Sequence, residues 1–260
     1  MIGKPATVSG AEVVTLPGDA MVGLVRAVAA LGRAHIGRHV VVGGVAVTVR
    51  LRQAHRATAD VDAVVDETTP PDAIEALAAL PDVERDRDSA HRLWIAGTKI
   101  EIQQVGHVTD ADFEGLTDRQ ALYVAAHTWA LETAIPATLI AAADDQVSAT
   151  APFATSAALI AMKLHAIQDR RPSGGMDKRA GDAWDLYRLL TDLDADASIR
   201  TALSAAPLPL RAAVREAAQA VLVDGATRTR SWLRSGDARM AAVTAEEIRF
   251  LAEPLVAALA

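Results

Sequence analysis

The chain has 260 residues, no cysteine and a formal net charge of −7. The absence of cysteine excludes disulfide frameworks, zinc–thiolate sites and cysteine nucleophiles, and the negative charge disfavours general electrostatic attraction to nucleic acid. No stretch approaches the roughly 20 apolar residues of a membrane span, and the N-terminus lacks the apolar run of a secretion signal, so we expect a cytoplasmic protein without membrane contact.

Charge and periodicity divide the chain into two parts. Residues 1–150 carry 12 basic and 20 acidic side chains, whereas residues 151–260 carry 14 and 13. Strand and helix patterns alternate in the first part, and only helical patterns follow Thr155. We therefore expect an α+β fold, with an α/β domain in residues 1–150 and a helical domain in residues 151–260.

The predicted elements of the first part begin with an apolar helix at 20–34. A buried strand ending in a glycine turn (39–44), a short helix (45–51) and a second strand (60–65) follow. A helix with a proline start is expected at 70–80, and strand-like runs are expected at 83–88, 91–97, 98–105 and within 121–142. In the second part, helices are expected near 155–170, 177–192, 208–222, 226–235 and 244–258.

Gly43 and Gly44 lie where the first buried strand gives way to a helix. Backbone N–H groups at such a turn, together with the positive end of the helix, are suited to hold phosphate oxygens. An ordinary strand-to-helix turn also needs glycine. The two glycines alone therefore leave both interpretations open.

Asp60 and Asp62 are two residues apart in a predicted strand, so both carboxylates project from one face. Such a pair repels itself and needs a counter-ion, and Mg²⁺ takes one or two carboxylates together with substrate phosphates. The alternative is a pair of solvated acids on an open sheet face. Glu101 shares a face with Lys99 and Gln103 in the strand 98–105, and it supplies a third carboxylate if that strand lies beside the first.

Two amphipathic helices of the second part carry polar groups beside their apolar stripes. Lys163 and Arg170 lie together on the edge of the first stripe, and Lys178, Asp182 and Asp185 cluster on the second helix. Ordinary ion pairing on a helix surface explains part of this pattern. For Lys178 we favour that explanation, because Asp182 follows it by four residues.

The order of these motifs resembles the nucleotidyltransferase superfamily of the DNA polymerase beta type, and more closely the AbiEii/AbiGii-type toxin nucleotidyltransferases. The family pattern of a Gly-Gly turn, a short helix and Arg-x-Thr-x-Asp-x-Asp is matched by Gly43, Gly44, Arg56, Thr58, Asp60 and Asp62. Its K-x-x-A-x-x-x-R and D-x-x-D-L helices are matched by Lys163, Ala166 and Arg170, and by Asp182, Asp185 and Leu186. All of these matches lie within residues 39–190.

The resemblance implies a mixed sheet flanked by helices, followed by a C-terminal helical domain, with an NTP in the cleft between them. It implies that Asp60 and Asp62 bind Mg²⁺, with Glu101 as a candidate third ligand where the superfamily commonly has Asp. It implies that an active-site acid, Asp185 or its rival Asp182, activates the acceptor hydroxyl. The residues that it implies for nucleotide binding are Gly43, Gly44, Arg56, Thr58, Lys163 and Arg170.

The same resemblance implies a Mg²⁺-dependent nucleotidyltransferase that is the toxin of a type IV-like toxin–antitoxin, or abortive infection, system. A cognate antitoxin is then its partner, and an NMP passes from an NTP to an RNA such as the tRNA 3′ end, as in the MenT relatives. The alternatives are a small-molecule or protein acceptor, or a non-catalytic member that binds an NTP or a partner.

One segment outside the matched motifs is also suited to RNA. Arg228, Arg230 and Arg234 surround Trp232, and arginine beside an aromatic ring can clamp and stack on RNA. The commoner arrangement is a solvated helix face with a tryptophan buried on its other side.

Overall fold

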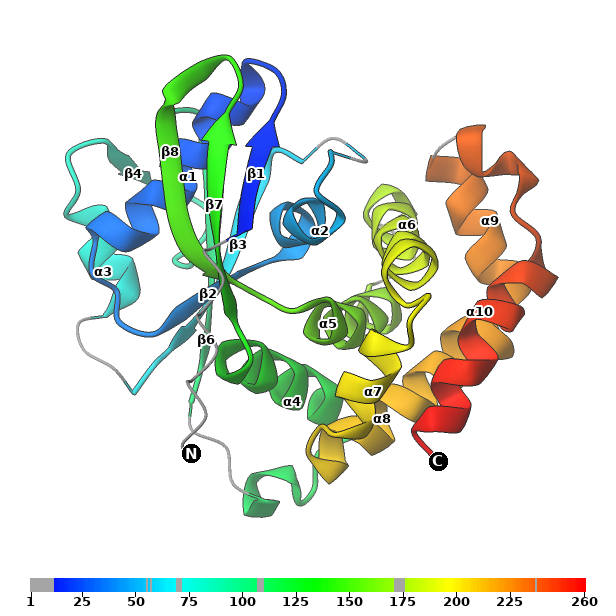
Figure 1. Cartoon of the computed structure of the whole chain (residues 1–260). Helices are drawn as coiled ribbons and strands as arrows, with labels where there is room; N and C mark the ends of the chain where they lie inside the picture. Colours follow the sequence, from blue (N-terminus) through cyan, green and yellow to red (C-terminus); the bar gives the residue numbers. More distant parts are fainter. Residues whose placement is uncertain are drawn as a thin grey trace, which may run out of the picture.

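A mixed sheet of eight strands, ordered β1-β7-β8-β2-β3-β6-β5-β4, forms the first part of the chain (Figure 1). The computed structural model describes residues 12–54, 56, 58–68, 72–106, 110–170, 176–236 and 238–260. The strands are β1 (Glu12–Leu16), β2 (His39–Val42), β3 (Asp60–Asp66), β4 (Val83–Arg85), β5 (Arg92–Ile95), β6 (Thr98–Val105), β7 (Ile135–Ala141) and β8 (Asp144–Phe153).

The centre of the sheet brings the predicted acidic residues side by side. β3 runs antiparallel to β2 and parallel to β6. In this register Asp60 lies opposite Lys99, and Asp62 lies opposite Glu101. The expectation that the strand carrying Glu101 lies beside the strand carrying the two aspartates is therefore confirmed.

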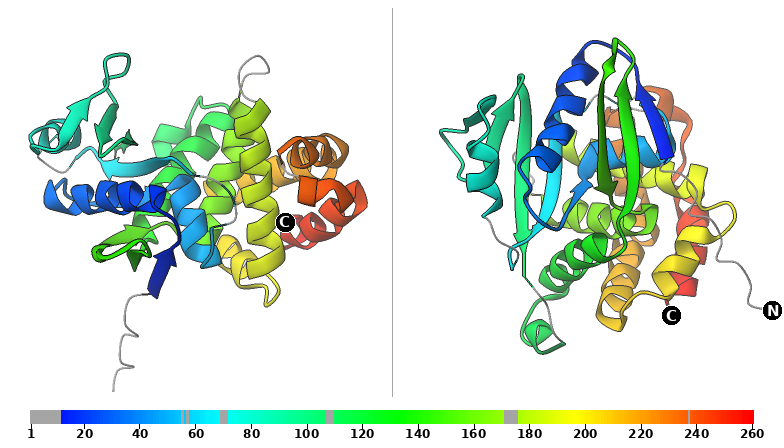
Figure 2. Two further views of the ribbon diagram at one scale, coloured as in Figure 1. Left: turned by 90° about the horizontal axis from the view of Figure 1, so that it is seen from above. Right: turned by 60° about the vertical axis from the view of Figure 1, so that its left-hand side comes forward.

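Helices cover both faces of the sheet (Figure 2). Gly23 of α1 (Ala20–Arg33) packs against Thr98 on one face of β6. Since successive strand residues point to opposite faces, Lys99, Glu101 and Gln103 point to the other face. That face carries α2 (Gly43–Leu51) and α4 (Asp118–Glu132), while α3 (Ala73–Ala78) packs beside β4 and β5.

The second part of the chain is helical. Its elements are α5 (Ser156–Asp169), α6 (Met176–Leu193), α7 (Ser198–Ser204), α8 (Leu208–Ala218), a π-helical turn (Gln219–Val223), α9 (Ala226–Gly236) and α10 (Ala245–Ala258). Helix α5 packs against α4 and α6, and α6 packs against α9 (Figure 1). These helices and the mixed sheet confirm the expected α+β fold class. No helix in the described ranges is long and apolar enough to span a bilayer.

Buried apolar side chains of the sheet and of the C-terminal helices form one continuous core. The expected boundary at residue 150 falls inside β8. The division into two domains, residues 1–150 and 151–260, stays a prediction.

The strands expected within 121–142 are partly wrong, because α4 continues to Glu132 and only β7 is a strand. Helix α4 begins with a capping box in which Thr117 and Gln120 satisfy each other's backbone N–H groups. Its buried residues Leu122, Ala126 and Trp129 recur at helical spacing. The structure also adds β1, β8 and α7, and it shortens the helix expected at 70–80 to α3, with residues 70 and 71 outside the described part.

Candidate active site

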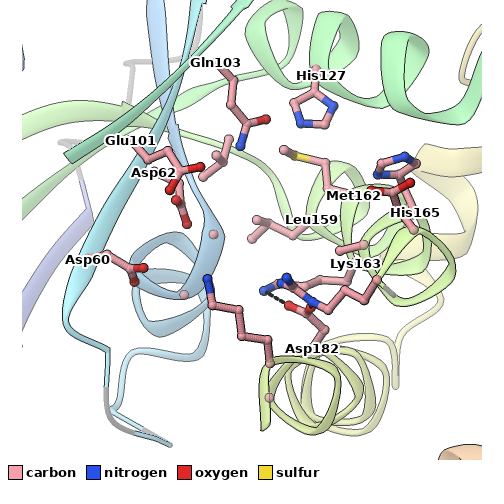
Figure 3. A pocket seen from close by; sticks show the side chains of 18 of the residues that line it. Asp60, Asp62, Glu101, Gln103, His127, Leu159, Met162, Lys163, His165 and Asp182 are labelled. Carbon is pink, nitrogen blue, oxygen red and sulfur yellow. Dashed lines mark hydrogen bonds and ion pairs between the residues drawn. The ribbon is translucent and has the colours of Figure 1, made fainter. Parts of the chain in front are cut away.

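A cavity of about 620 Å³ lies between the inner strands β3 and β6, the glycine turn at the start of α2, and helices α4, α5 and α6. Figure 3 shows side chains that line it. This volume lies within the roughly 300–1,000 Å³ range of small-molecule sites. Nine of the predicted site residues line the cavity: Gly43, Gly44, Arg56, Asp60, Asp62, Glu101, Lys163, Arg170 and Asp182. The other two, Thr58 and Asp185, lie behind its wall and contact residues that do line it.

The sheet side of the cavity is acidic. Lys99 Nζ lies 3.2 Å from Asp60 Oδ2 and 3.3 Å from Glu101 Oε2, and Arg92 Nε lies 3.3 Å from the same Glu101 oxygen. Burial on its own lowers the pKa of Lys99, but Asp60 and Glu101 outweigh it and hold that pKa above its usual value. Among the described residues, Asp62 forms no ion pair.

The surroundings of the Asp62 carboxyl group disfavour its ionised form. Burial, the neighbouring Asp60 carboxylate and Glu101 raise its pKa to about 6, although Lys163 and Lys99 oppose the shift. A carboxylate in this position gains from a cation that neither Lys99 nor Lys163 supplies directly. A bound cation beside Asp62 would therefore stabilise the acidic wall.

The donor set of this wall fits a metal held by two carboxylates. In the described ranges no group of three or more acidic, histidine or cysteine side chains is close enough to hold a metal alone. Glu101 is adjacent to Asp62 in register but is paired with Lys99 and Arg92. Asp60 and Asp62 with phosphate oxygens meet the requirement of Mg²⁺, which commonly keeps other ligands from substrate or water.

The glycine turn lets the start of α2 approach these groups closely. Gly43 has a φ of +67°, and a Cβ there would overlap Asp62 Oδ2. A Cβ at Gly44 would lie 2.6 Å from Thr58 Oγ1 and 2.8 Å from Arg56 Nη2. The α2 N-cap, Val42, makes no side-chain capping hydrogen bond, so the first N–H groups of α2 are suited to an anion.

A chain of alternating charges forms the opposite side. Arg56 donates from Nε to Asp185 Oδ1 and from Nη2 to Asp185 Oδ2, both at 2.7 Å. Lys163 Nζ lies 2.7 Å from Asp185 Oδ2 and 2.8 Å from Asp182 Oδ1. Arg170 Nε donates to Asp182 Oδ2 at 2.7 Å. Both carboxylates are therefore held on both oxygens by cations.

The centre of this charge network is buried. Asp185 has no exposed surface, and Lys163 is 6% exposed. Burial lowers the pKa of Lys163, but Asp182 and Asp185 together outweigh burial and hold the pKa above its usual value. The same balance, with Asp185 as the main partner, raises the pKa of Arg56. Three cations face two carboxylates, which leaves this side of the cavity with net positive charge.

Lys178 adds an exposed cation that our sequence analysis assigned to a helix-surface pair with Asp182. That assignment is wrong, because the Asp182 carboxylate is taken by Lys163 and Arg170. Lys178 lines the cavity instead and is solvent-exposed. Helix spacing alone did not show that cations from α5 and its C-terminus would reach Asp182 first.

The far end of the cavity is lined by residues that sequence reasoning did not assign to the site: Gln103, Tyr123, His127 and His165. Figure 3 shows Gln103, His127 and His165 on the side away from Asp60. Burial lowers the pKa of His127 to about 4, helped by His165 and opposed by the hydrogen bond to the Tyr123 carbonyl. Recognising Tyr123 and His127 from sequence required a helix at 118–132, where i and i+4 share a face.

The Arg–Trp segment adopts the commoner of its two expected arrangements. Trp232 is only 8% exposed. The guanidinium carbons of Arg179 and Arg228 lie 5.1 and 5.5 Å from its ring centroid, and Arg230 Nε donates to the Val243 carbonyl. The ring is therefore covered by protein.

A family model described as "Nucleotidyl transferase AbiEii toxin, Type IV TA system" matches residues 26–259. A search of curated proteins finds no match.

Proposed function

Since the chain belongs to the AbiEii family of nucleotidyl transferase toxins, we propose that its cavity transfers an NMP from an NTP to an RNA hydroxyl, such as that of the tRNA 3′ end. The family makes the chain a nucleotidyltransferase of a type IV toxin–antitoxin system, with an NTP as substrate and an antitoxin as partner. The RNA acceptor and the use of Mg²⁺ are parts of the proposal.

The observation that carries the proposal is the pair of opposed walls. Asp60 and Asp62 lie on one side of the cavity, and Lys163 lies across from them (Figure 3). Arg170, which is bound to Asp182, and Lys178 also line the cavity. A triphosphate between these walls meets cations on one side, and on the other it meets carboxylates that need a counter-ion.

Asp60 and Asp62 are the residues that would hold Mg²⁺. When bound, the ion neutralises charge on the phosphates and helps to orient the α-phosphate toward the attacking hydroxyl. Glu101 as a further ligand stays a prediction, since its carboxylate is paired with Lys99 and Arg92.

The chain's own groups would bind and orient the triphosphate. We assign phosphate binding to the N–H groups of Gly43 and Gly44 and to the side chains of Lys163, Arg170 and Lys178. An ammonium group has three N–H donors, and Lys163 uses two of them on Asp182 and Asp185. The third is available to a phosphate oxygen.

Asp182 and Asp185 suit a positioning role better than the role of general base. Each carboxylate is already held on both oxygens by two cations, and Asp185 has no exposed surface with which to reach an acceptor hydroxyl. In this proposal Asp185 and Asp182 fix the Lys163 ammonium at the cavity wall. Arg56 and Thr58 support the glycine turn, where they crowd Gly44.

The test is transfer of label from each of the four α-labelled NTPs, with Mg²⁺, to total tRNA, resolved on a denaturing gel. We expect label on RNA with wild type and none with Asp62→Asn. Asp66→Asn is the matched control, because Asp66 lies on the same strand but bonds Thr68 and does not line the cavity.

Each departure from this pattern overturns a different part of the proposal. Full activity of Asp62→Asn overturns the metal assignment. Label on a small molecule or a protein, and none on RNA, overturns the RNA acceptor. NTP binding without transfer to any acceptor identifies a non-catalytic member.

A further inference from the structure

One wall of the cavity takes no part in the charge network or in the proposed phosphate contacts. We call it the base wall, formed by Gln103 of β6, Tyr123 and His127 of α4, and His165 of α5. Its rings are in mutual contact: the Tyr123 centroid lies 4.1 Å from that of His127 and 5.1 Å from that of His165. The wall is therefore a small, preformed aromatic surface inside a polar cavity.

The base wall also presents two hydrogen-bond acceptors. His127 Nδ1 lies 2.6 Å from the Tyr123 carbonyl oxygen. Since a carbonyl only accepts, Nδ1 carries the hydrogen, and Nε2 of the neutral ring is an acceptor. Gln103 Oε1 is buried and has no hydrogen-bond partner among the described residues. A buried acceptor without a donor is unfavourable, so a ligand that brings N–H groups is stabilised here.

The base wall lies at the end of the cavity away from Asp60 (Figure 3). The carboxylates and the glycine turn lie at one end of the cavity, and Figure 3 shows His127 and His165 across the cavity from Asp60. A triphosphate at the charged walls directs the rest of the molecule toward the rings. Aromatic side chains stack on nucleobases whatever the base.

We propose that the base wall binds the nucleobase of the NTP donor, stacks it on Tyr123 and His165, and accepts its N–H groups at Gln103 and His127. The inference rests on the proposed function, since it concerns the donor of that reaction. Adenine, cytosine and guanine carry an exocyclic amino group, whereas uracil offers one N–H between two carbonyl oxygens. The Gln103 amide has an acceptor and two N–H donors, so it can pair with an amino group or, after rotation, with a uracil carbonyl, and the base wall suits all four bases.

The experiment measures binding without turnover. The full chain is titrated with ATP, CTP, GTP, UTP and tripolyphosphate, with Mg²⁺ and without any acceptor, by calorimetry. For wild type we expect the four nucleotides to bind with similar affinity, because each base can stack on the rings and the Gln103 amide can accept from or donate to its edge. Tripolyphosphate, which has no base, should bind more weakly than any of the four.

Two variants separate the base wall from the phosphate site. Gln103→Leu should weaken all four nucleotides about tenfold and leave tripolyphosphate unchanged. Gln104→Leu is the matched control, because Gln104 is the next residue of β6, points to the opposite face and does not line the cavity. Tyr123→Leu should weaken all four nucleotides at least about fivefold through lost stacking, again without effect on tripolyphosphate.

The outcomes distinguish the inference from its premise. Nucleotides that bind Gln103→Leu and Tyr123→Leu as tightly as they bind wild type overturn the base wall. If Lys163→Ala still loses nucleotide and tripolyphosphate binding in that case, the phosphate site stands. A wild-type chain that binds neither the nucleotides nor tripolyphosphate overturns the proposed function and the inference together. Circular dichroism confirms that each variant is folded.

Discussion

Replacing Asp185 by Asn tests how much the buried ion pairs of Asp185 with Arg56 and Lys163 stabilise the folded chain. The carboxylate has no exposed surface, accepts two hydrogen bonds of 2.7 Å from Arg56 and lies 2.7 Å from Lys163 Nζ. An amide keeps the shape but removes the negative charge between two cations. Removing one partner of a buried ion pair costs about 3–5 kcal/mol.

The structure places the expected loss near the lower end of that range. The Arg56 side chain is 25% exposed, so water compensates part of its charge, and Lys163 keeps Asp182 as a partner. We therefore expect Asp185→Asn to lower the free energy of unfolding by about 3 kcal/mol. The assay is urea unfolding at neutral pH, followed by far-ultraviolet circular dichroism.

Asp192→Asn is the matched control on the same helix. Its partner Arg188 lies four residues earlier, and the two side chains are 31% and 20% exposed. Such a surface pair contributes only about 0.3–0.5 kcal/mol. A loss for Asp185→Asn no larger than the loss for Asp192→Asn would falsify the reasoning.

Three further predictions concern other parts of the cavity. Gly43→Ala should reduce the rate of transfer at least about tenfold, since its Cβ overlaps Asp62 Oδ2 at a positive φ. Gly32→Ala should leave the rate unchanged, because no atom lies within 4 Å of its Cβ. Equal rates for the two variants would contradict a role for the glycine turn in the site. Lys178→Met should raise the apparent KM for the NTP several-fold, because it removes one exposed phosphate contact. The melting temperature should not change. An unchanged KM would show that Lys178 does not contact the phosphates. Burial lowers the pKa of His127 to about 4 from an ordinary 6.5. Between these pH values the unfolded chain therefore binds more protons than the folded chain. The free energy of unfolding should fall by about 3 kcal/mol as the pH drops from 6.5 to 4. His127→Asn should flatten that fall in urea titrations, and a curve that keeps its slope would show that other groups cause it.

The part of the site that sequence reasoning predicted is the part held by local geometry. Gly43 and Gly44 at a strand end, and Asp60 and Asp62 on one strand face, follow from turn and strand periodicity alone. The placement of Glu101 beside Asp62 needed one assumption about strand order, and the register confirms it. Its ion pairs with Arg92 and Lys99 depend on side chains from two strands, which no pattern within one segment shows.

The missed elements have weak or conflicting local patterns. In β8 the buried Ala149, Ala151 and Phe153 alternate with more exposed residues, but alanine favours helices and weakens that strand pattern. In α4 the capping residues Thr117 and Gln120 were a helix signal that the short apolar runs after them obscured. Because of that misassignment, Tyr123 and His127, the α4 residues of the base wall, were not recognised.

The most direct test of the central claim is to follow the two ends of the triphosphate separately. The same NTP is supplied with Mg²⁺ and tRNA, labelled once on the α-phosphate and once on the γ-phosphate, and both products are resolved. Nucleotidyl transfer breaks the bond between the α- and β-phosphates, so the account predicts the α-label on RNA and the γ-label in free pyrophosphate. A γ-label on the acceptor would contradict the proposed transfer, and so would release of the γ-label as inorganic phosphate without labelled RNA.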